Sequence, residues 1–229
     1  MRIFLAGDTH GINDIGKLHY FNNHGDGRFL NKNDYVIILG DTAIAWSNEE
    51  YENKIRAEYD KFNWTTLFLD GNHVNHSKLI NLPTFNFHNG KASRVTDNII
   101  YLRRGEIYTF NNKKFLIIGG ALSIDKANRT EGIDYWSTEL LSYEEECHVI
   151  DNLKKHNYKV DYILTHTIPI DFVKILNDIF KIHDPVARFL QHIYNNTKFK
   201  KWFAGHFHVD KQMLNLNILF NDLIEIEEL

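Results

Sequence analysis

Residues 2–11 read RIFLAGDTHG, a short apolar run that ends in a glycine, followed by an aspartate and a histidine. A continuous apolar run of this length is typical of a strand that is covered on both faces of its sheet. The polar residues after it are therefore expected at the carboxyl end of a buried strand.

Four further apolar runs are followed by polar residues in the same way. The runs, each with the block that follows it, are 35–39 before GD (40–41), 65–69 before DGNH (70–73), 162–164 before TH (165–166) and 202–204 before GHFH (205–208). In open α/β sheets, ligands bind beyond the carboxyl ends of the strands. We therefore expect the five polar blocks to meet at one edge of a sheet.

Segments with helical character lie between these runs, at residues 48–62, 143–156 and 185–194. Ser142, with Glu145 three residues later, has the spacing of a capping box and marks the start of the second of these helices. Strands that alternate with helices predict an α/β fold with parallel strands.

The middle and the C-terminal part predict a second kind of strand grouping. Its strands are expected at residues 98–102, 107–110, 114–118, 212–216, 218–220 and 223–226. The short links in the middle predict antiparallel hairpins, with Arg103 and Arg104 in a solvated turn. No linker or repeat interrupts the chain, so we predict one domain spanning residues 1–229.

Composition excludes several classes of protein. The 229 residues carry a formal charge of −4, which argues against a protein held to nucleic acid by a basic surface. The single cysteine, Cys147, forms no internal disulfide and leaves no thiolate zinc site. The apolar runs are too short for a signal peptide or a membrane span, so we expect a cytoplasmic protein without a membrane partner.

The five blocks together contribute carboxylates, imidazoles and one amide oxygen. The side chains are those of Asp8, His10, Asp41, Asn72, His73, His166, His206 and His208. This donor set suits Mn²⁺, Zn²⁺ or iron better than Cu⁺ or Ca²⁺. A donor set of this size is too large for one tetrahedral ion and suits two ions roughly 3.5–4 Å apart that share a carboxylate. With a bridging hydroxide, such a centre keeps a charge of about +1, which attracts a phosphate oxygen.

The five blocks, in this order between residues 7 and 208, resemble those of the calcineurin-like metallophosphoesterase superfamily, in particular its small bacterial and phage members. The resemblance implies a four-layer α/β/β/α sandwich, in which two mixed β-sheets are flanked by helices. It also implies hydrolysis of a phosphomonoester or phosphodiester by attack of a metal-bridging hydroxide. Two divalent ions are implied as cofactors, with Mn²⁺ expected and iron, Zn²⁺ or Ni²⁺ as alternatives.

The resemblance further implies a role for each residue of the blocks. The metal ligands are Asp8, His10 and His208 for one ion, Asn72, His166 and His206 for the other, and Asp41 for both. Asn72 and His73 contact the substrate. His73 protonates the leaving oxygen, so that Asp41 and His73 are the expected catalytic pair.

Two blocks depart from the pattern of the protein Ser/Thr phosphatases. The motif Asp-Arg-Gly is missing after Asp41, where the chain reads TAIA, and Val74 stands in place of a glutamate. A protein phosphatase of that subclass is therefore not expected, and the residue that orients His73 is left open, with Asp70 as a candidate. Arg129 or Lys126, in the segment 119–136, is expected to replace the missing phosphate-binding arginine.

Three functions compete. The first is a hydrolase acting on a small nucleotide or organic phosphate. The second is a nuclease of the same superfamily, which the length and charge of the chain disfavour, so a nucleic-acid partner is not expected. The third is a non-catalytic scaffold, although such relatives commonly lose the ligands that this chain keeps. Trp46 either lines the substrate opening or packs against the following helix.

Overall fold

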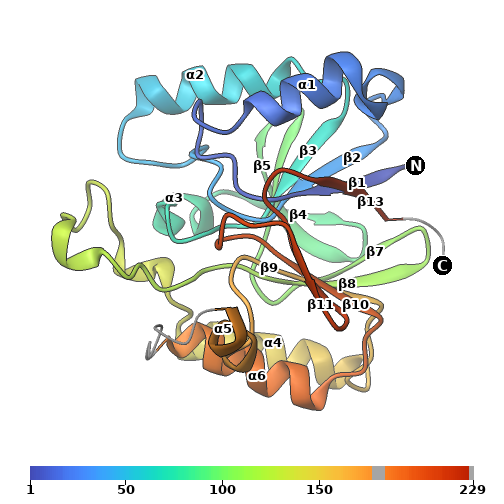
Figure 1. The fold of residues 1–229 in the computed structure, drawn as a ribbon, viewed down its shortest axis with the longest axis vertical. Helices are drawn as coiled ribbons and strands as arrows, with labels where there is room; N and C mark the ends of the chain where they lie inside the picture. Colours follow the sequence, from blue (N-terminus) through green and yellow to red (C-terminus); the bar gives the residue numbers. More distant parts are fainter. Residues whose placement is uncertain (177–183, 227–229) are drawn as a thin grey trace.

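The structure, a computed structural model, describes residues 1–176 and 184–226. Two mixed β-sheets pack face to face, and helices cover the outer face of each sheet (Figure 1). The predicted four-layer α/β/β/α sandwich is therefore confirmed. None of the helices in the described ranges is long and apolar enough to cross a membrane.

The first sheet has seven strands, and its central strands are parallel. In spatial order they are β13 (Leu223–Glu225), β1 (Ile3–Ala6), β2 (Tyr35–Ile38), β3 (Thr65–Phe68), β6 (Ile99–Leu102), β5 (Gly90–Thr96) and β4 (Thr84–Phe87). The helices on its outer face are α1 (Gly16–His24), α2 (Glu49–Asp60) and α3 (His76–Ile80).

The second sheet has six strands. In spatial order they are β11 (Lys211–Met213), β12 (Leu216–Ile218), β10 (Lys201–Ala204), β9 (Tyr162–Thr165), β8 (Lys113–Ile118) and β7 (Ile107–Phe110). The helices on its outer face are α4 (Tyr143–Lys155), α5 (Ile170–Leu176) and α6 (Pro185–Asn196). The capping box predicted for α4 is present, with both Ser142 and Glu145 bonded as expected.

Strand β1 shows why the decisive runs are apolar without alternation. Phe4 and Ala6 pack under the helices, whereas Ile3 and Leu5 pack between the two sheets. All four side chains are at most 3% exposed. Because both faces of the strand are buried, each residue contributes apolar area, worth roughly 1.5–3 kcal/mol for a large aliphatic or aromatic side chain.

One predicted hairpin is wrong. The strands at 98–102 and 107–110 do not pair, because β6 belongs to the first sheet, where it runs parallel to β3, and β7 belongs to the second. The link between them crosses from one sheet to the other. Arg104 within it is only 5% exposed and is not in a solvated turn. The next hairpin, between β7 and β8, is antiparallel as predicted.

Several elements were not predicted or lie elsewhere. The edge hairpin of β4 and β5 and the helices α1, α3 and α5 were missed. The strand predicted at 212–216 begins one residue and ends three residues earlier, and the strand predicted at 218–220 lies two residues earlier. Strand β13 begins where predicted but pairs with β1 in the first sheet. This return brings the end of the described chain beside its beginning (Figure 1).

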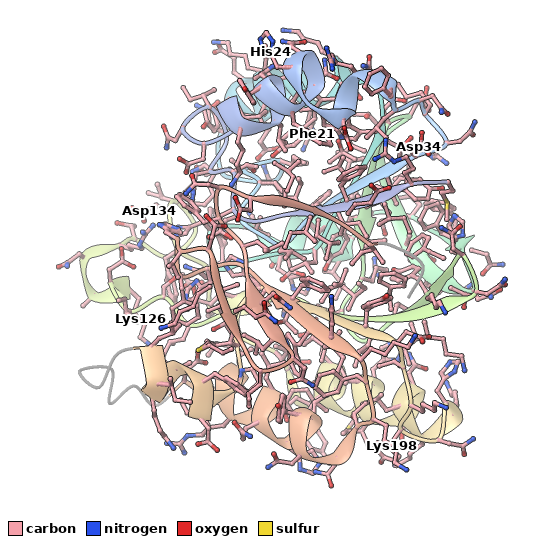
Figure 2. All side chains as sticks on the ribbon, turned by 45° about the vertical axis from the view of Figure 1, so that its right-hand side comes forward. Phe21, His24, Asp34, Lys126, Asp134 and Lys198 are labelled. Carbon is pink, nitrogen blue, oxygen red and sulfur yellow. The ribbon has the colours of Figure 1, made fainter. Side chains whose placement is uncertain are left out.

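The segment between β8 and α4 projects from the body of the molecule (Figure 1). Lys126 and Asp134 lie on it, at the opposite side of the molecule from Lys198 (Figure 2). The short 3₁₀ turns η2 (Lys126–Asn128) and η3 (Ser137–Glu139) belong to this segment, and a third, η1 (Asp26–Phe29), follows α1. The projecting segment starts beside the carboxyl ends of the central strands, where the polar blocks gather.

Candidate metal centre

The five polar blocks meet at the carboxyl ends of β1, β2, β3, β9 and β10, as expected. Two overlapping groups of side chains have the spacing needed to hold a cation. They are Asp8, His10 and His208, and Asp8, Asp41 and His166. Asn72, His73 and His206 lie against these groups. The structure thus brings together all eight residues expected from the sequence.

The carboxylate of Asp41 lies at the middle of the cluster and is 1% exposed. Its Oδ1 accepts a hydrogen bond from the backbone N–H of His73 at 2.8 Å. Its Oδ2 lies 3.5 Å from Nε2 of His10 and 3.3 Å from Nε2 of His166. A Cβ on Gly71 would lie 2.0 Å from Oδ1, so only glycine leaves room for this carboxylate.

The carboxylate of Asp8 is fully buried beside it. It accepts the backbone N–H of His206 at 2.9 and 3.0 Å, and it lies 3.2 Å from Nε2 of His208. A Cβ on Gly205 would lie 2.2 Å from Oδ1 of Asp8. Glycines from other blocks therefore leave space for the two aspartates.

Two of the histidines are oriented from outside the cluster. Nδ1 of His10 donates to the carboxylate of Asp14 at 2.8 Å, and Nδ1 of His166 donates to the carbonyl of Leu39 at 2.7 Å. Both acceptors are oxygens, so Nε2 of each ring is turned towards Asp41. Metal-binding histidines are typically held in this way.

The amide of Asn72 is oriented by a chain of hydrogen bonds. Its Nδ2 donates to Oγ of Ser123 at 3.0 Å, and Oγ of Ser123 donates to Glu139 at 2.5 Å. The backbone N–H of Ser123 also donates to Glu139, at 2.9 Å. Oδ1 of Asn72 is thereby turned to the cluster, 3.0 Å from Nε2 of His166. An amide oxygen aimed in this way suits a metal ligand.

The two buried carboxylates, Asp8 and Asp41, determine the protonation of the histidines around them. Burial disfavours charge on His166, but Asp41 and Asp8 outweigh it and raise its pKa to about 10. Burial and the charged His166 lower the pKa of His206 to about 3. The proton on His166 compensates the carboxylates, and a bound metal cation would displace it.

Four of the predicted ligands have left-handed backbones. The φ angles are 39° at His10, 47° at Asp41, 71° at His206 and 50° at His208. This region is disfavoured for residues with a side chain and is found where the surrounding structure enforces it, commonly at functional sites. Together with the oriented imidazoles and the Asn72 oxygen, this geometry fits a site for divalent metal ions.

Comparison with known proteins decides the family. The profile of the calcineurin-like phosphoesterase family matches residues 1–210. The chain belongs to this family. The family is one of phosphoesterases, and the cluster offers the carboxylates and imidazoles that could hold a metal ion. No curated protein matches the sequence.

The fold is shared with a solved structure described as a "putative 5'-nucleotidase from Staphylococcus aureus in complex with alpha-ketoglutarate". The TM-score is 0.51 at 14% identity, and the match covers 96% of this chain. Because it covers 48% of the other chain, this phosphoesterase spans about half the length of that neighbour. At such low identity the likeness concerns the fold alone.

Asp70 does not orient His73 in this phosphoesterase. Its carboxylate accepts hydrogen bonds from Arg104 at 2.6 and 2.8 Å and from Tyr101 at 2.8 Å. The ring of His73 instead lies 5.9 Å from that of His10 and 6.1 Å from that of Trp46. The sequence-based candidate for this role is therefore wrong, because a buried carboxylate next to a buried arginine pairs with it.

Arg104 anchors the projecting segment to the body of the protein. Besides Asp70, it donates to the backbone carbonyls of Thr138 and Leu140, each at 3.0 Å, and to Glu145 at 2.9 Å. These bonds fix the end of the segment that holds Glu139. Arg104 thus helps to hold Glu139 in position, and with it the hydrogen bonds that orient Asn72.

Arg129 lies where the sequence suggested. It lines a hollow together with His10, Asp41 and His73, and its guanidinium pairs with Asp125 at 2.7 Å. Trp46 lines the same hollow, and its ring packs edge-on against Trp136 of the projecting segment, at 4.8 Å between ring centres. The ring therefore borders the hollow, and its aromatic partners are Trp136 and His73, neither of which is on the following helix.

Sequence reasoning missed the residues that orient the ligands. Asp14, Ser123, Glu139 and Arg104 all act through hydrogen bonds across the fold. Asp14 carried a weak local signal, since it stands four residues after His10. The others are far from their partners in sequence, and only the packed structure brings them together.

Proposed function

We propose that this chain hydrolyses a small phosphate ester at a centre of two divalent metal ions, with Mn²⁺ as the expected ion. The observation that carries the proposal is the position of Asp41. One oxygen of its carboxylate lies 3.5 Å from His10 and 3.3 Å from His166, and these histidines belong to different expected ligand sets. A carboxylate between two sets of ligands is the arrangement that a dinuclear centre needs.

The remaining ligands divide around this carboxylate. One ion would be held by Asp8, His10 and His208, the other by Asn72, His166 and His206, with Asp41 contacting both. The short contact between Asp8 and His208 supports the first set, and that between Asn72 and His166 supports the second. Bound ions would activate water at neutral pH and polarise the phosphoryl oxygens.

The substrate would be positioned by two residues on the open side of the cluster. Arg129 lines the hollow next to Asp41 and supplies a guanidinium, which pairs well with phosphate oxygens. His73 borders the same hollow, from which it would give a proton to the leaving oxygen. Burial lowers the pKa of His73 in the unbound chain, and the negative charge of a bound phosphate ester would raise it again and favour the protonated ring.

A nucleotide is the favoured class of small substrate. The neighbour of similar fold is described as a putative 5'-nucleotidase, and the aromatic side chain of Trp46 offers a nucleobase a stacking surface near the centre. The net charge of −4 disfavours a long nucleic acid.

The test is turnover by the metal-loaded protein together with its metal content. We expect the Mn²⁺-loaded chain to bind two ions and to hydrolyse 4-nitrophenyl esters of phosphoric acid. Asp41→Ala should lose both properties. Asp171→Ala, which changes an exposed aspartate on α5, should keep them. A folded wild-type protein that binds no metal and cleaves none of these esters would instead support the scaffold function.

A further inference from the structure

The predicted metal centre lies between two hollows that share only Asp41 and His73. The first hollow has a volume of about 360 Å³ and extends over His206 and His208. The second has a volume of about 300 Å³ and extends over His10. The first hollow thus borders ligands of both expected sets, His208 of one and Asn72 and His206 of the other, whereas the second borders His10. Both hollows border the carboxylate of Asp41, which is expected to bridge the ions.

The first hollow has apolar walls. Leu122 and Ile124 come from the projecting segment, Val173 from α5, and Phe207 from the last polar block. Ile124 is 64% exposed, so its side chain is free to cover a bound group. A substituent that buries apolar or aromatic surface here would gain binding free energy in proportion to the area covered.

The first hollow is also unfavourable for additional negative charge. Asp125 and Asp184 both line it, and Asp184 is only 7% exposed. A group with a terminal phosphate would meet the buried Asp184 there, together with Asp125, whose charge is partly offset by Arg129. A neutral group would not, and any N–H donors on it would find acceptors.

The second hollow offers aromatic surface and a cation. Trp46 and Tyr51 line it, and Arg129 closes it. The pair formed by Arg129 and Asp125, at 2.7 Å, stands between the two spaces, since Asp125 lines the first and Arg129 the second. The hollows are therefore separate pockets with different walls.

We propose that the substrate is a phosphodiester whose two organic groups occupy one hollow each, with a neutral apolar or aromatic group in the first. A phosphomonoester has one organic group and would leave one hollow filled by solvent. In the reaction, a water oxygen bonds to phosphorus and one ester P–O bond breaks. The leaving oxygen takes a proton from His73. The attacking water releases a proton to solvent, and His73 is reprotonated from solvent. The products are an alcohol and a phosphomonoester. The inference rests on the proposed function.

Binding can be measured without turnover by using phosphinates, whose P–C bonds are not hydrolysed. Dibenzylphosphinate carries two aromatic groups, and benzyl(methyl)phosphinate carries one at the same charge. By calorimetry on the Mn²⁺-loaded protein, we expect the two-armed probe to bind about tenfold more tightly, as is typical for filling an apolar pocket. Equal affinities would overturn the proposal.

Variants locate the two arms. Ile124→Ser and Trp46→Leu, one in each hollow, should each reduce the advantage of the two-armed probe to about threefold or less. Ile133→Ser is the matched control, because Ile133 lies on the same projecting segment, is 58% exposed and lines neither hollow. An advantage that survives both hollow variants, or that falls equally with Ile133→Ser, would refute the placement.

Hydrolysis separates this inference from the proposed function. We expect kcat/KM at least tenfold higher for bis(4-nitrophenyl) phosphate than for 4-nitrophenyl phosphate. A higher value for the monoester would refute the diester inference and leave the phosphoesterase function standing. If neither ester is cleaved but dibenzylphosphinate keeps its advantage, the proposed function fails and the two-pocket assignment stands.

Discussion

Asp41 and Asp70 are two buried aspartates that follow neighbouring parallel strands, β2 and β3, yet they have opposite surroundings. Asp70 is neutralised by Arg104, which stays protonated in proteins, and by a hydrogen bond from Tyr101. Asp41 faces His10, His166 and a backbone N–H. A buried carboxylate needs a compensating charge. Asp70 receives it from Arg104, which is permanently charged, whereas Asp41 receives it from a proton on His166, which a bound metal ion would replace.

The largest effect is expected on catalysis, when the charge of Asp41 is removed. Asp41→Asn keeps the shape and the acceptor for the His73 N–H but loses the charge. We expect kcat/KM to fall by at least about 10³-fold, since the ions supply several kcal/mol of transition-state stabilisation. Metal analysis should show fewer than two ions per chain. The variant should remain folded, and a protein that keeps wild-type turnover would break the comparison.

The second effect concerns the structural aspartate. Asp70→Asn leaves Arg104 buried with less compensation and should lower the free energy of unfolding by about 3–5 kcal/mol. Denaturant titration measures it. The double variant Asp70→Asn with Arg104→Met should recover part of the loss, because the fully buried arginine is removed together with its partner, and Glu145 is partly exposed to solvent. A single variant as stable as the wild type would show that this pair does not hold the fold.

The pH dependence of the unfolding free energy tests whether the pair of Asp70 and Arg104 stabilises the fold. Burial alone would raise the pKa of Asp70, but Arg104 outweighs it and holds the pKa below the ordinary value of 3.8. The stability from Asp70 is therefore fully present above about pH 4 and is lost as pH falls through the lowered pKa. The difference in unfolding free energy between wild type and Asp70→Asn should stay constant from pH 7 to pH 5. A difference that shrinks already within that range would contradict the assignment.

A smaller effect is expected for the residue that orients Asn72. Ser123→Ala removes the acceptor of the amide N–H, so the amide is no longer held with its oxygen towards the cluster. Loss of such supporting bonds typically costs 10–100-fold in metal affinity. Metal titration by calorimetry should show the loss for one of the two ions. Ser137→Ala, on the exposed part of the same segment, is the control and should bind metal normally.

The smallest effect is expected for Arg129, which, unlike Arg104, borders the hollow next to Asp41. Arg129→Ala should raise KM by about tenfold, the value of one charge-assisted hydrogen bond, with little change in kcat. Steady-state kinetics with a 4-nitrophenyl ester measures both constants. Lys126→Ala is the comparison. If it raises KM while Arg129→Ala does not, the phosphate contact belongs to Lys126.

The parts of the fold that could be predicted are those whose physics is local. The runs before the five blocks are apolar on both faces because they lie between two layers, and the capping box at Ser142 needs only adjacent residues. The missed hairpin of β4 and β5 has many exposed side chains and so carries little apolar signal. The crossing between β6 and β7 was mistaken for a hairpin because a short link looks alike in both cases. Burial of Arg104 by Asp70 distinguishes them, and this is a tertiary contact.

For the candidate site, the sequence predicted which residues come together but not which residues orient them. Asp8, His166 and the other block residues were placed together because each follows a strand, and strand ends meet at one edge of a sheet. What holds them in position was not predictable. Glu139 reaches Asn72 only through Ser123, and no spacing in the sequence reveals such a chain.

The hydrogen bond between Ser123 and Glu139 has a consequence for how this protein can change. It closes the base of the projecting segment, and Arg104 ties the carbonyls of Thr138 and Leu140 beside it. A loop of another sequence or length, grafted between positions 124 and 136, would give the first hollow a new wall while Asn72 kept its orientation. The residues that would set substrate selectivity and those expected to bind metal thus lie in separate segments of the chain. The first segment can change by mutation or engineering while the second is kept.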